Sequence, residues 1–224
     1  MKVYIGYDTG QDIAYQVCKS SILKYTNVEI IPLVQQNLRE RGIYTRDIDP
    51  LSSTEFTFTR FLVPYLNEYK DWAMFVDSDF LFTEDISNLF EVANEEYAVM
   101  VVKHNYNPES LIKMNNKQQL LYPRKNWSSL ILWNCSHPSN RKLSTKIVNE
   151  QSGSYLHRFN WLDDNEIGEI DLRWNWLVNW HTESKDGVPK ALHYTEGGPW
   201  LENYKNCEYA DLWINEKNRM LGPQ

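Results

Sequence analysis

Residues 73–80 read AMFVDSDF, and the interpretation of the whole chain begins with this stretch. Two carboxylates, Asp77 and Asp79, follow a short apolar run and precede another aromatic residue, Phe80. Carboxylates are rarely buried unless they are paired, hydrogen-bonded or bound to a metal. Because alternate side chains of a strand point to the same side, both carboxylates can project together from the end of a strand.

The sequence around this stretch predicts strands that alternate with helices. Strands are expected over 2–7, 28–33, 73–76, 97–102, 128–134 and 190–194. Helices are expected over 13–22, 54–69, 86–90, 139–149 and 208–220, with a kink or an interruption at Pro64 and caps at Thr9 or Asp12 and at Ser139. Residues 34–53 and 103–127 are polar and are expected to form loops. The alternation favours an α/β fold with a mostly parallel or mixed sheet and helices on both faces, as one domain over 1–224.

Composition and charge limit the function and the location. The net charge of −7 argues against a nucleic-acid partner. Cys18, Cys135 and Cys207 are widely spaced and odd in number, which indicates free thiols in a reducing compartment. The longest apolar runs are too short to span a bilayer, and the N-terminus has no secretory leader pattern. A cytoplasmic protein without an integral membrane segment is therefore expected, while its oligomeric state cannot be read.

The carboxylate pair favours a metal site. Open α/β sheets bind ligands beyond the carboxyl ends of their strands. Asp77 and Asp79 at such an end would suit Mg²⁺ or Mn²⁺, with phosphate oxygens completing the shell. The alternative is a strand end at which both residues only cap a turn. The sequence has no GxGxxG, GxxxxGK[ST] or GxSxG motif, so any bound phosphate would be held by a metal and by side chains.

His193 is a candidate third ligand. It follows a predicted strand and precedes Gly197, Gly198 and Pro199, which predict a tight turn and allow backbone to approach a ligand. An imidazole ligand would shift the preference from Mg²⁺ towards Mn²⁺. A satisfied core histidine is the alternative.

Two further polar features lie in apolar surroundings. Arg60 lies in a mostly apolar predicted helix, where it either binds a diphosphate or carboxylate or extends its head to the surface. Asp163 and Asp164 follow Trp161-Leu162. They either accept hydrogen bonds from substrate hydroxyls, form a second acidic pair, or are acidic residues at a helix N-terminus.

Taken in order, these motifs resemble those of metal-dependent GT-A glycosyltransferases. They are most similar to family eight, which includes glycogenin and the bacterial lipopolysaccharide galactosyltransferases, and the similarity runs from VYIGYD (3–8) to GGPW (197–200). The resemblance implies a Rossmann-like nucleotide-diphospho-sugar transferase fold. It also implies base and ribose contacts from Tyr7 and Asp8, and a donor sugar-phosphate contact from Arg60.

The same resemblance assigns the metal site and the sugar site. It implies that Asp77, Asp79 and His193 hold Mn²⁺ (or Mg²⁺) on the donor diphosphate, and that Asp163 or Asp164 contacts the donor sugar. Ser78, Gly197 and Gly198 are also expected to bind the donor.

Two departures from the family pattern affect these expectations. The strand 127–134 lacks the family's Asn and Gly, which leaves the donor sugar open. The closing motif, 193–200, is shorter by one residue and lacks the lysine that grips the diphosphate. Stabilisation of the leaving group would then rest on the metal, Arg60 and backbone groups.

The expected activity is transfer of a hexose from a UDP-linked donor to the hydroxyl of a carbohydrate or glycan acceptor. The resemblance implies Mn²⁺ dependence and retention of configuration, and the lack of an obvious carboxylate nucleophile favours same-face displacement. Three alternatives stay open: a haloacid-dehalogenase-type phosphatase with Asp77 as nucleophile, a glycosidase with two working carboxylates, and a non-catalytic sugar-binding protein.

Overall fold

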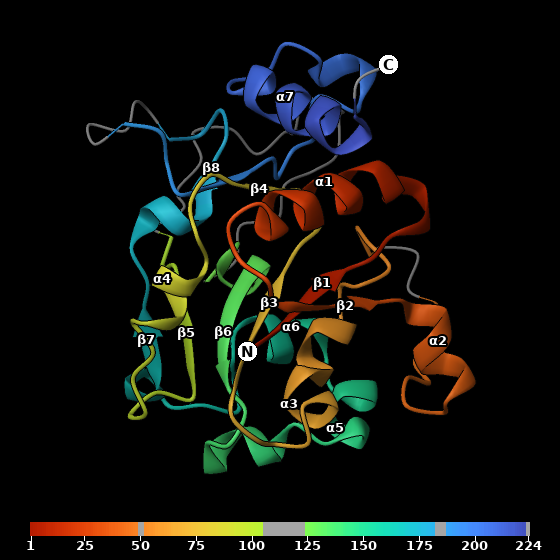
Figure 1. The fold of residues 1–224 in the computed structure, drawn as a ribbon. Helices are drawn as coiled ribbons and strands as arrows, with labels where there is room; N and C mark the ends of the chain where they lie inside the picture. The colour runs from red at the N-terminus through yellow and green to blue at the C-terminus, as the bar shows by residue number, and fades with distance from the viewer. Residues whose placement is uncertain (49–51, 105–123, 182–186, 223–224) are drawn as a thin grey trace.

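The computed structural model describes residues 1–48, 52–104, 124–181 and 187–222. Its centre is a six-stranded sheet with the strand order β2-β1-β3-β6-β5-β7 (Figure 1). The strands are β1 (Lys2–Gly6), β2 (Glu29–Leu33), β3 (Trp72–Val76), β5 (Val99–Val101), β6 (Leu130–Asn134) and β7 (Ile167–Glu169). β1 is parallel to β2 and β3, and β5 is parallel to β7, whereas β6 is antiparallel to β3 and β5. The predicted mixed, mostly parallel sheet is confirmed.

Helices cover both faces of this sheet, as predicted. The helices are α1 (Asp12–Leu23), α2 (Gln35–Glu40), α3 (Val63–Leu66), α4 (Ser87–Phe90), α5 (Thr145–Glu150), α6 (Gly153–His157) and α7 (Ala210–Leu221). Alternate residues of β1 point to opposite faces of the sheet. Val3 and Ile5 belong to an apolar cluster with residues of α1, whereas Tyr4 belongs to a different cluster with Phe61 and Leu156. In Figure 1, α1 lies on one side of the sheet and α3, α5 and α6 lie on the other.

A second, three-stranded sheet continues from the first. It has the order β4-β9-β8, formed by β4 (Phe80–Phe82), β9 (Ala191–His193) and β8 (Trp176–Leu177). β4 is antiparallel to β9, and Phe80 pairs with His193. The segment Asp77-Ser78-Asp79 is therefore the link between the last residue of β3 and the first residue of β4.

Several predicted boundaries were wrong where the elements are short. Residues 34–53, expected to be a loop, contain α2, and α6 was not expected at all. The predicted helix 54–69 is replaced by a 3₁₀ helix, Thr59–Leu62, followed by α3. Pro64 lies in the first turn of α3, so of the two predicted outcomes the structure has the interruption and not the kink. Proline is tolerated there because the first amides of a helix have no partner within it.

The predicted caps were also displaced. Asp8, not Thr9 or Asp12, caps the first helical turn by accepting a hydrogen bond from the Gly10 amide at 2.9 Å. The predicted helix 139–149 is divided into a 3₁₀ helix, Pro138–Lys142, and α5, whose cap is Ser144 instead of Ser139. The remaining 3₁₀ helices are Thr9–Gln11, Trp127–Ser129, Asp164–Glu166, Leu172–Asn175 and Glu202–Tyr204.

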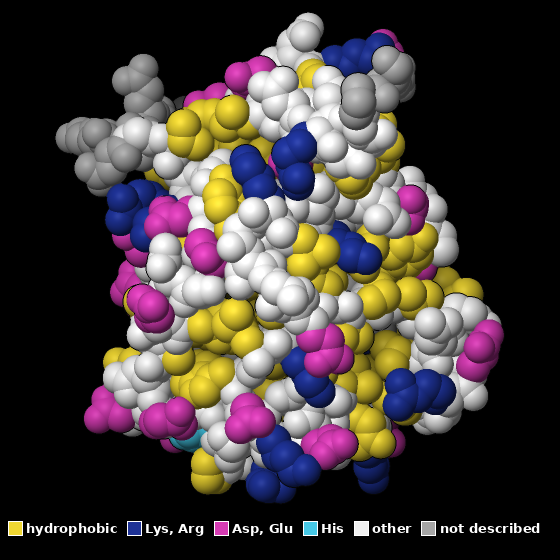
Figure 2. Space-filling model, viewed as in Figure 1, with side chains coloured by type: hydrophobic (Ala, Val, Ile, Leu, Met, Phe, Trp, Pro, Cys, Tyr) yellow, Lys and Arg dark blue, Asp and Glu magenta, His cyan; other side chains and the backbone are white. Residues whose placement is uncertain are grey.

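The other general predictions concern thiols, charge and membrane spans. All three cysteines are free, as predicted, and Cys18 and Cys135 are buried. On the face drawn in Figure 2, Lys and Arg side chains are interspersed with Asp and Glu. Among the described residues, no helix is long and apolar enough to cross a membrane. The predicted polar loop 103–127 lies mostly outside the described residues.

Candidate metal and nucleotide-sugar site

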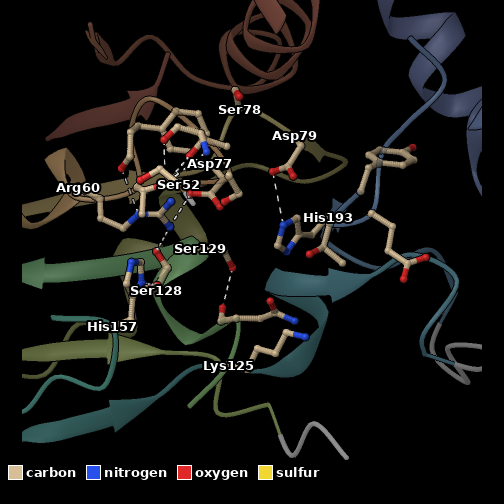
Figure 3. A pocket seen from close by; sticks show the side chains of 18 of the residues that line it. Ser52, Arg60, Asp77, Ser78, Asp79, Lys125, Ser128, Ser129, His157 and His193 are labelled. Atoms are coloured by element: carbon tan, nitrogen blue, oxygen red, sulfur yellow. Dashed lines mark hydrogen bonds and ion pairs between the residues drawn. The ribbon is translucent and has the colours of Figure 1, made fainter. Parts of the chain in front are cut away.

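The Asp77-Ser78-Asp79 link lies where four strands meet, β3, β6, β4 and β9. β3 delivers Asp77, and the Asp77 amide donates a hydrogen bond to the Ser129 carbonyl oxygen at 2.9 Å, beside the start of β6. The Tyr194 amide donates to the Asp79 carbonyl oxygen at 3.0 Å and extends the β4–β9 pairing. These backbone bonds fix the link at both ends, and Figure 3 shows the Ser78 side chain turned away from Arg60 and His193.

Asp77, Asp79 and His193 converge. One potential ligand atom from each lies within 4.8 Å of the other two. His193 Nε2 lies 3.4 Å from Asp79 Oδ1, and the side chains of these two residues are 2% and 23% exposed, respectively (Figure 3). The His193 ring stacks on Phe80 with centroids 4.3 Å apart, which holds the ring plane in place. The predicted convergence is present, and the donor set of two carboxylates and one imidazole suits a divalent cation.

One carboxylate oxygen of this cluster lacks a hydrogen-bond partner in the described part of the chain and could coordinate such an ion. Asp79 Oδ1 is buried and has no hydrogen-bond partner among the described residues. An unsatisfied buried carboxylate oxygen is costly, and a bound cation would remove that cost. The residues therefore fit a divalent metal.

Arg60 reaches this cluster from the 3₁₀ helix Thr59–Leu62. Its Nη1 lies 2.8 Å from Asp77 Oδ1 and donates to the Ser128 carbonyl oxygen at 2.8 Å. The guanidinium also packs over the rings of Phe56 and Phe75, at 5.4 and 4.9 Å from their centroids. Arg60 is 6% exposed, so its charge is balanced within the protein and mainly by Asp77.

The two carboxylates differ in their electrostatic environment. Burial raises the pKa of Asp77 above its ordinary value, against the opposing charge of Arg60 and with a further contribution from Asp79. Burial acts in the same direction on Asp79, but the adjacent His193 ring outweighs it and keeps the pKa of Asp79 below its ordinary value. Asp79 is therefore the more readily ionised member of the pair.

The cluster forms part of the wall of a pocket with a volume of about 670 Å³. This volume is within the range of small-molecule binding sites, which is roughly 300–1,000 Å³. Besides this cluster, the pocket wall includes the segment around Thr54 and Phe58, the start of α6, and residues 194–197 with Trp200 and Leu201.

The other predicted donor-binding residues take different positions. Gly197 lines the pocket and has a φ of +134°, a conformation that favours glycine, whereas Gly198 is not among the lining residues. Ser78 lines the pocket but is 2% exposed. Tyr7 donates a hydrogen bond to Asp12 at 3.0 Å, and Asp8 accepts one from the Glu55 amide at 3.2 Å. Neither Tyr7 nor Asp8 lines the pocket, so their nucleotide contacts stay predictions.

Asp163 and Asp164 are not brought together with the metal cluster. Both are exposed at the start of the 3₁₀ helix Asp164–Glu166, and the Asp163 amide donates to Glu166 Oε2 at 2.8 Å. Asp164 forms an ion pair with Arg124. Neither residue lines the pocket, and the donor-sugar contact assigned to them stays a prediction.

Sequence reasoning missed several polar residues of the site. Asn175 is fully buried and lies 2.9 Å from His193, measured between Asn175 Oδ1 and His193 Nδ1. The motif WNW (174–176) is the signal that could have found it, because a buried amide between two tryptophans needs polar partners. Lys125 lies in the pocket wall beneath Ser129 (Figure 3). His157 lies beside Ser128, and burial lowers the pKa of His157 to about 3, so this ring is neutral.

Solved structures with the same fold are glycosyltransferases. GlyE of Streptococcus pneumoniae TIGR4 aligns with 96% of this chain at 15% identity and a TM-score of 0.65, and the chain spans 59% of GlyE. The bifunctional glycosyltransferase WbbM aligns with 97% of the chain at 15% identity and a TM-score of 0.69, and the chain spans 49% of WbbM. The galactosyltransferase LgtC, solved with donor and acceptor sugar analogues, aligns over the whole chain at 12% identity and a TM-score of 0.62. The chain therefore has the GT-A glycosyltransferase fold.

A curated relative shows the family. Protein CDI of Arabidopsis thaliana is 51% identical over 220 residues, which cover 96% of this chain and 85% of that protein. The chain belongs to the family of Protein CDI. No model of a known protein family matches the sequence.

Proposed function

We propose that the protein transfers a hexose from a nucleotide diphosphate sugar, UDP-linked, to a hydroxyl of a carbohydrate or glycan acceptor. The observation that carries the proposal is the convergence of Asp77, Asp79 and His193 on one pocket of a GT-A fold. These residues would hold Mn²⁺, or Mg²⁺ in its place, against the donor diphosphate.

The charge of the pocket supports a metal. Its described wall carries three permanently charged cations (Arg60, Lys125 and Arg158) and three carboxylates (Asp77, Asp79 and Glu196). Those charges cancel, whereas both phosphates of a diphosphate diester are ionised at neutral pH. Without a further cation, the bound donor would leave the pocket with excess negative charge in a partly buried setting, which is unfavourable.

The bound metal would supply electrostatic stabilisation of the charge that grows on the leaving diphosphate. Asp77, Asp79 and His193 would hold the ion, and the Phe80 ring, stacked on His193, keeps the imidazole from turning away. Arg60 keeps Asp77 in place, because its guanidinium is itself fixed by Ser128 and two aromatic rings.

The sugar and the acceptor would occupy the remainder of the pocket. Trp200 is a half-buried aromatic side chain in the pocket wall, and flat apolar rings of this kind suit the apolar faces of sugars. With Asp77 and Asp79 assigned to the metal, Glu196 is the remaining carboxylate of the described wall. We propose same-face displacement with retention of configuration, in which no carboxylate acts as a covalent nucleophile.

The alternatives are distinguishable. The phosphatase is not supported, because the chain has a glycosyltransferase fold. A glycosidase would need no nucleotide and no metal, and a sugar-binding protein would bind glycans without releasing nucleotide.

The test is nucleotide release from a panel of UDP-sugars in the presence of candidate glycan acceptors. We expect release with MnCl₂ and none with EDTA, and restoration when Mn²⁺ is returned in excess. Release that continues unchanged in EDTA would overturn the proposed metal mechanism. Hydrolysis of glycans without any UDP-sugar would indicate the glycosidase.

A further inference from the structure

The histidine of the cluster is connected to a chain of buried hydrogen bonds. His193 Nδ1 lies 2.9 Å from Asn175 Oδ1, and Asn175 Nδ2 lies 2.9 Å from Ser129 Oγ. Ser129 Oγ in turn lies 2.7 Å from the Asn126 carbonyl oxygen. Asn175, His193 and Ser129 are 0%, 2% and 4% exposed, so water does not compete for these contacts.

Which group donates in each hydrogen bond of this chain follows from its last member, the Asn126 carbonyl oxygen. A carbonyl oxygen only accepts, so the Ser129 hydroxyl must donate its proton to Asn126. Ser129 Oγ then has only lone pairs to offer, so Asn175 must present its NH₂ group to Ser129. The amide orientation, which is otherwise ambiguous, is fixed in this way, and Asn175 Oδ1 faces His193.

The same logic fixes the proton on the imidazole. Asn175 Oδ1 accepts only, so His193 Nδ1 must carry a hydrogen, and a neutral ring then has its lone pair on Nε2. Nε2 is the nitrogen that lies 3.4 Å from Asp79 Oδ1. Two acceptors therefore face each other there, and the gap requires a proton or a metal ion between them.

We infer that Asn175 and Ser129 are positioning residues that keep His193 in its metal-binding tautomer. The inference about the metal rests on the proposed function, whereas the inference about the tautomer does not. If the Ser129 hydroxyl is lost, the Asn175 amide loses the acceptor that holds its NH₂ group in this orientation, and the amide can turn over. Its NH₂ group can then donate to Nδ1, the ring proton moves to Nε2, and the lone pair no longer faces Asp79.

Ser129 contacts the cluster in two ways: its backbone binds the carboxylate link, and its side chain binds the residue that contacts His193. Its carbonyl oxygen accepts from the Asp77 amide at 2.9 Å, while its hydroxyl sets the orientation of Asn175. Substituting Ser129 by alanine keeps the first contact and removes only the second. The variant Ser129→Ala therefore isolates the proposed role from the backbone geometry of the carboxylate link.

The first test needs no metal and no activity. Long-range ¹H–¹⁵N correlation spectra of the metal-free protein distinguish the two neutral tautomers of His193 from each other. We expect a protonated Nδ1 in the wild type and a larger share of protonated Nε2 in Ser129→Ala. A wild-type ring protonated on Nε2, or a tautomer ratio unchanged by Ser129→Ala, would overturn the inference.

The second test measures binding of MnCl₂ alone by calorimetry. We expect Ser129→Ala to weaken Mn²⁺ binding by about ten- to a hundred-fold, as is typical when a group that orients a metal ligand is removed. Ser129→Thr keeps the hydroxyl and should recover most of the affinity.

Ser21→Ala is the matched control for a lost buried hydroxyl. Ser21 is 0% exposed, and its Oγ donates to the Cys18 carbonyl oxygen and accepts from the Phe82 amide, so its hydrogen bonds are outside the chain that joins Asn126, Ser129, Asn175 and His193. This variant should lose thermal stability and keep its Mn²⁺ affinity. An equal loss of affinity in Ser21→Ala and Ser129→Ala would overturn the positioning role. If the wild type binds no Mn²⁺, the proposed function fails instead, and the spectra still decide the tautomer.

Discussion

Asp79 Oδ1 and His193 Nε2 lie 3.4 Å apart, although the two residues are 193 − 79 = 114 positions apart in the sequence. The pairing of β4 with β9 produces this contact, because it places Phe80 opposite His193 and hence Asp79 beside the ring. A metal site at this point depends on the second sheet as much as on the first. Damage to either sheet should therefore affect metal binding.

The variant Asp79→Asn should lose most of its affinity for Mn²⁺ and keep its fold. Asparagine has nearly the same shape as aspartate, but it removes the negative charge that a hard cation requires. In a thermal-shift titration, MnCl₂ should raise the melting temperature of the wild type and leave that of the variant nearly unchanged. Glu91→Gln removes a carboxylate at an exposed position and serves as the charge-matched control. Equal Mn²⁺ responses in Asp79→Asn and the wild type would contradict the site.

Replacing Arg60 should destabilise the protein and change its response to metal. Arg60→Met leaves the Asp77 carboxyl buried without its ion-pair partner, which typically costs about 3–5 kcal/mol. Because Mn²⁺ can compensate the same carboxylate, the variant should gain more stability from MnCl₂ than the wild type does. Chemical denaturation with and without MnCl₂ measures both effects. A variant as stable as the wild type would contradict the importance of this ion pair.

The three cysteines should differ in reactivity in the native protein. Burial raises the pKa of Cys207 to about 11 and that of Cys135 to about 12, and it raises the pKa of Cys18 further. Because the thiolate is the reactive form, iodoacetamide at about pH 8 should label the half-buried Cys207 slowly and leave Cys18 and Cys135 unlabelled. Labelling of Cys207 should accelerate as the pH rises towards its pKa. Mass spectrometry gives the rates, and rapid native labelling of Cys18 would contradict its burial.

A methyl group at Gly6 should destabilise the fold and disturb the pocket wall. A Cβ there would lie 2.4 Å from Phe56 Cγ, and Phe56 both lines the pocket and packs on Arg60. Overpacking of this kind costs about 1–3 kcal/mol. Gly10→Ala is the matched control, because its nearest neighbour would be Asp8 Oδ1 at 3.3 Å. Similar denaturation midpoints for Gly6→Ala and Gly10→Ala would show that the Phe56 ring yields without cost.

The buried Glu216 should make the attachment of α7 sensitive to acid. Burial favours the neutral acid, but hydrogen bonds from Arg219 and Ser20 outweigh it and lower the pKa of Glu216. A lowered pKa means that the stabilisation is present above the ordinary pKa of a glutamate, about 4.3, and is lost as the pH falls through the lower folded value. The Glu216→Gln variant should therefore be less stable at about pH 7, and its difference from the wild type should shrink in acid. A difference that is independent of pH would contradict this ionic contribution.

Much of the fold could be predicted because the long periodic elements are strong signals. β1, β2, β3 and α1 follow apolar patterns of the expected period, and they agree with the prediction within a few residues. The short elements could not be predicted in the same way. α2 and α6 have six and five residues, lengths at which helices depend on tertiary packing more than on intrinsic propensity.

The site could be predicted only as separate pieces. Asp77, Asp79 and His193 each stand at a strand end in the sequence, but their convergence depends on the β4–β9 register, which no local pattern reveals. Arg60 was expected at the diphosphate, and this contact stays a prediction, whereas its ion pair with Asp77 was not expected from the sequence. The role of Asn175 depends on a distant serine, so it emerges only from the three-dimensional arrangement.

The most direct test of the account is calorimetric titration of UDP into the protein with and without MnCl₂. We predict that the wild type binds UDP in the presence of Mn²⁺ and loses that binding in EDTA. Asp79→Asn and His193→Gln should each fail to bind UDP even in the presence of MnCl₂, while keeping the wild-type circular dichroism spectrum. UDP binding that is equally tight without metal, or unchanged in both variants, would contradict a metal-diphosphate site built from Asp77, Asp79 and His193.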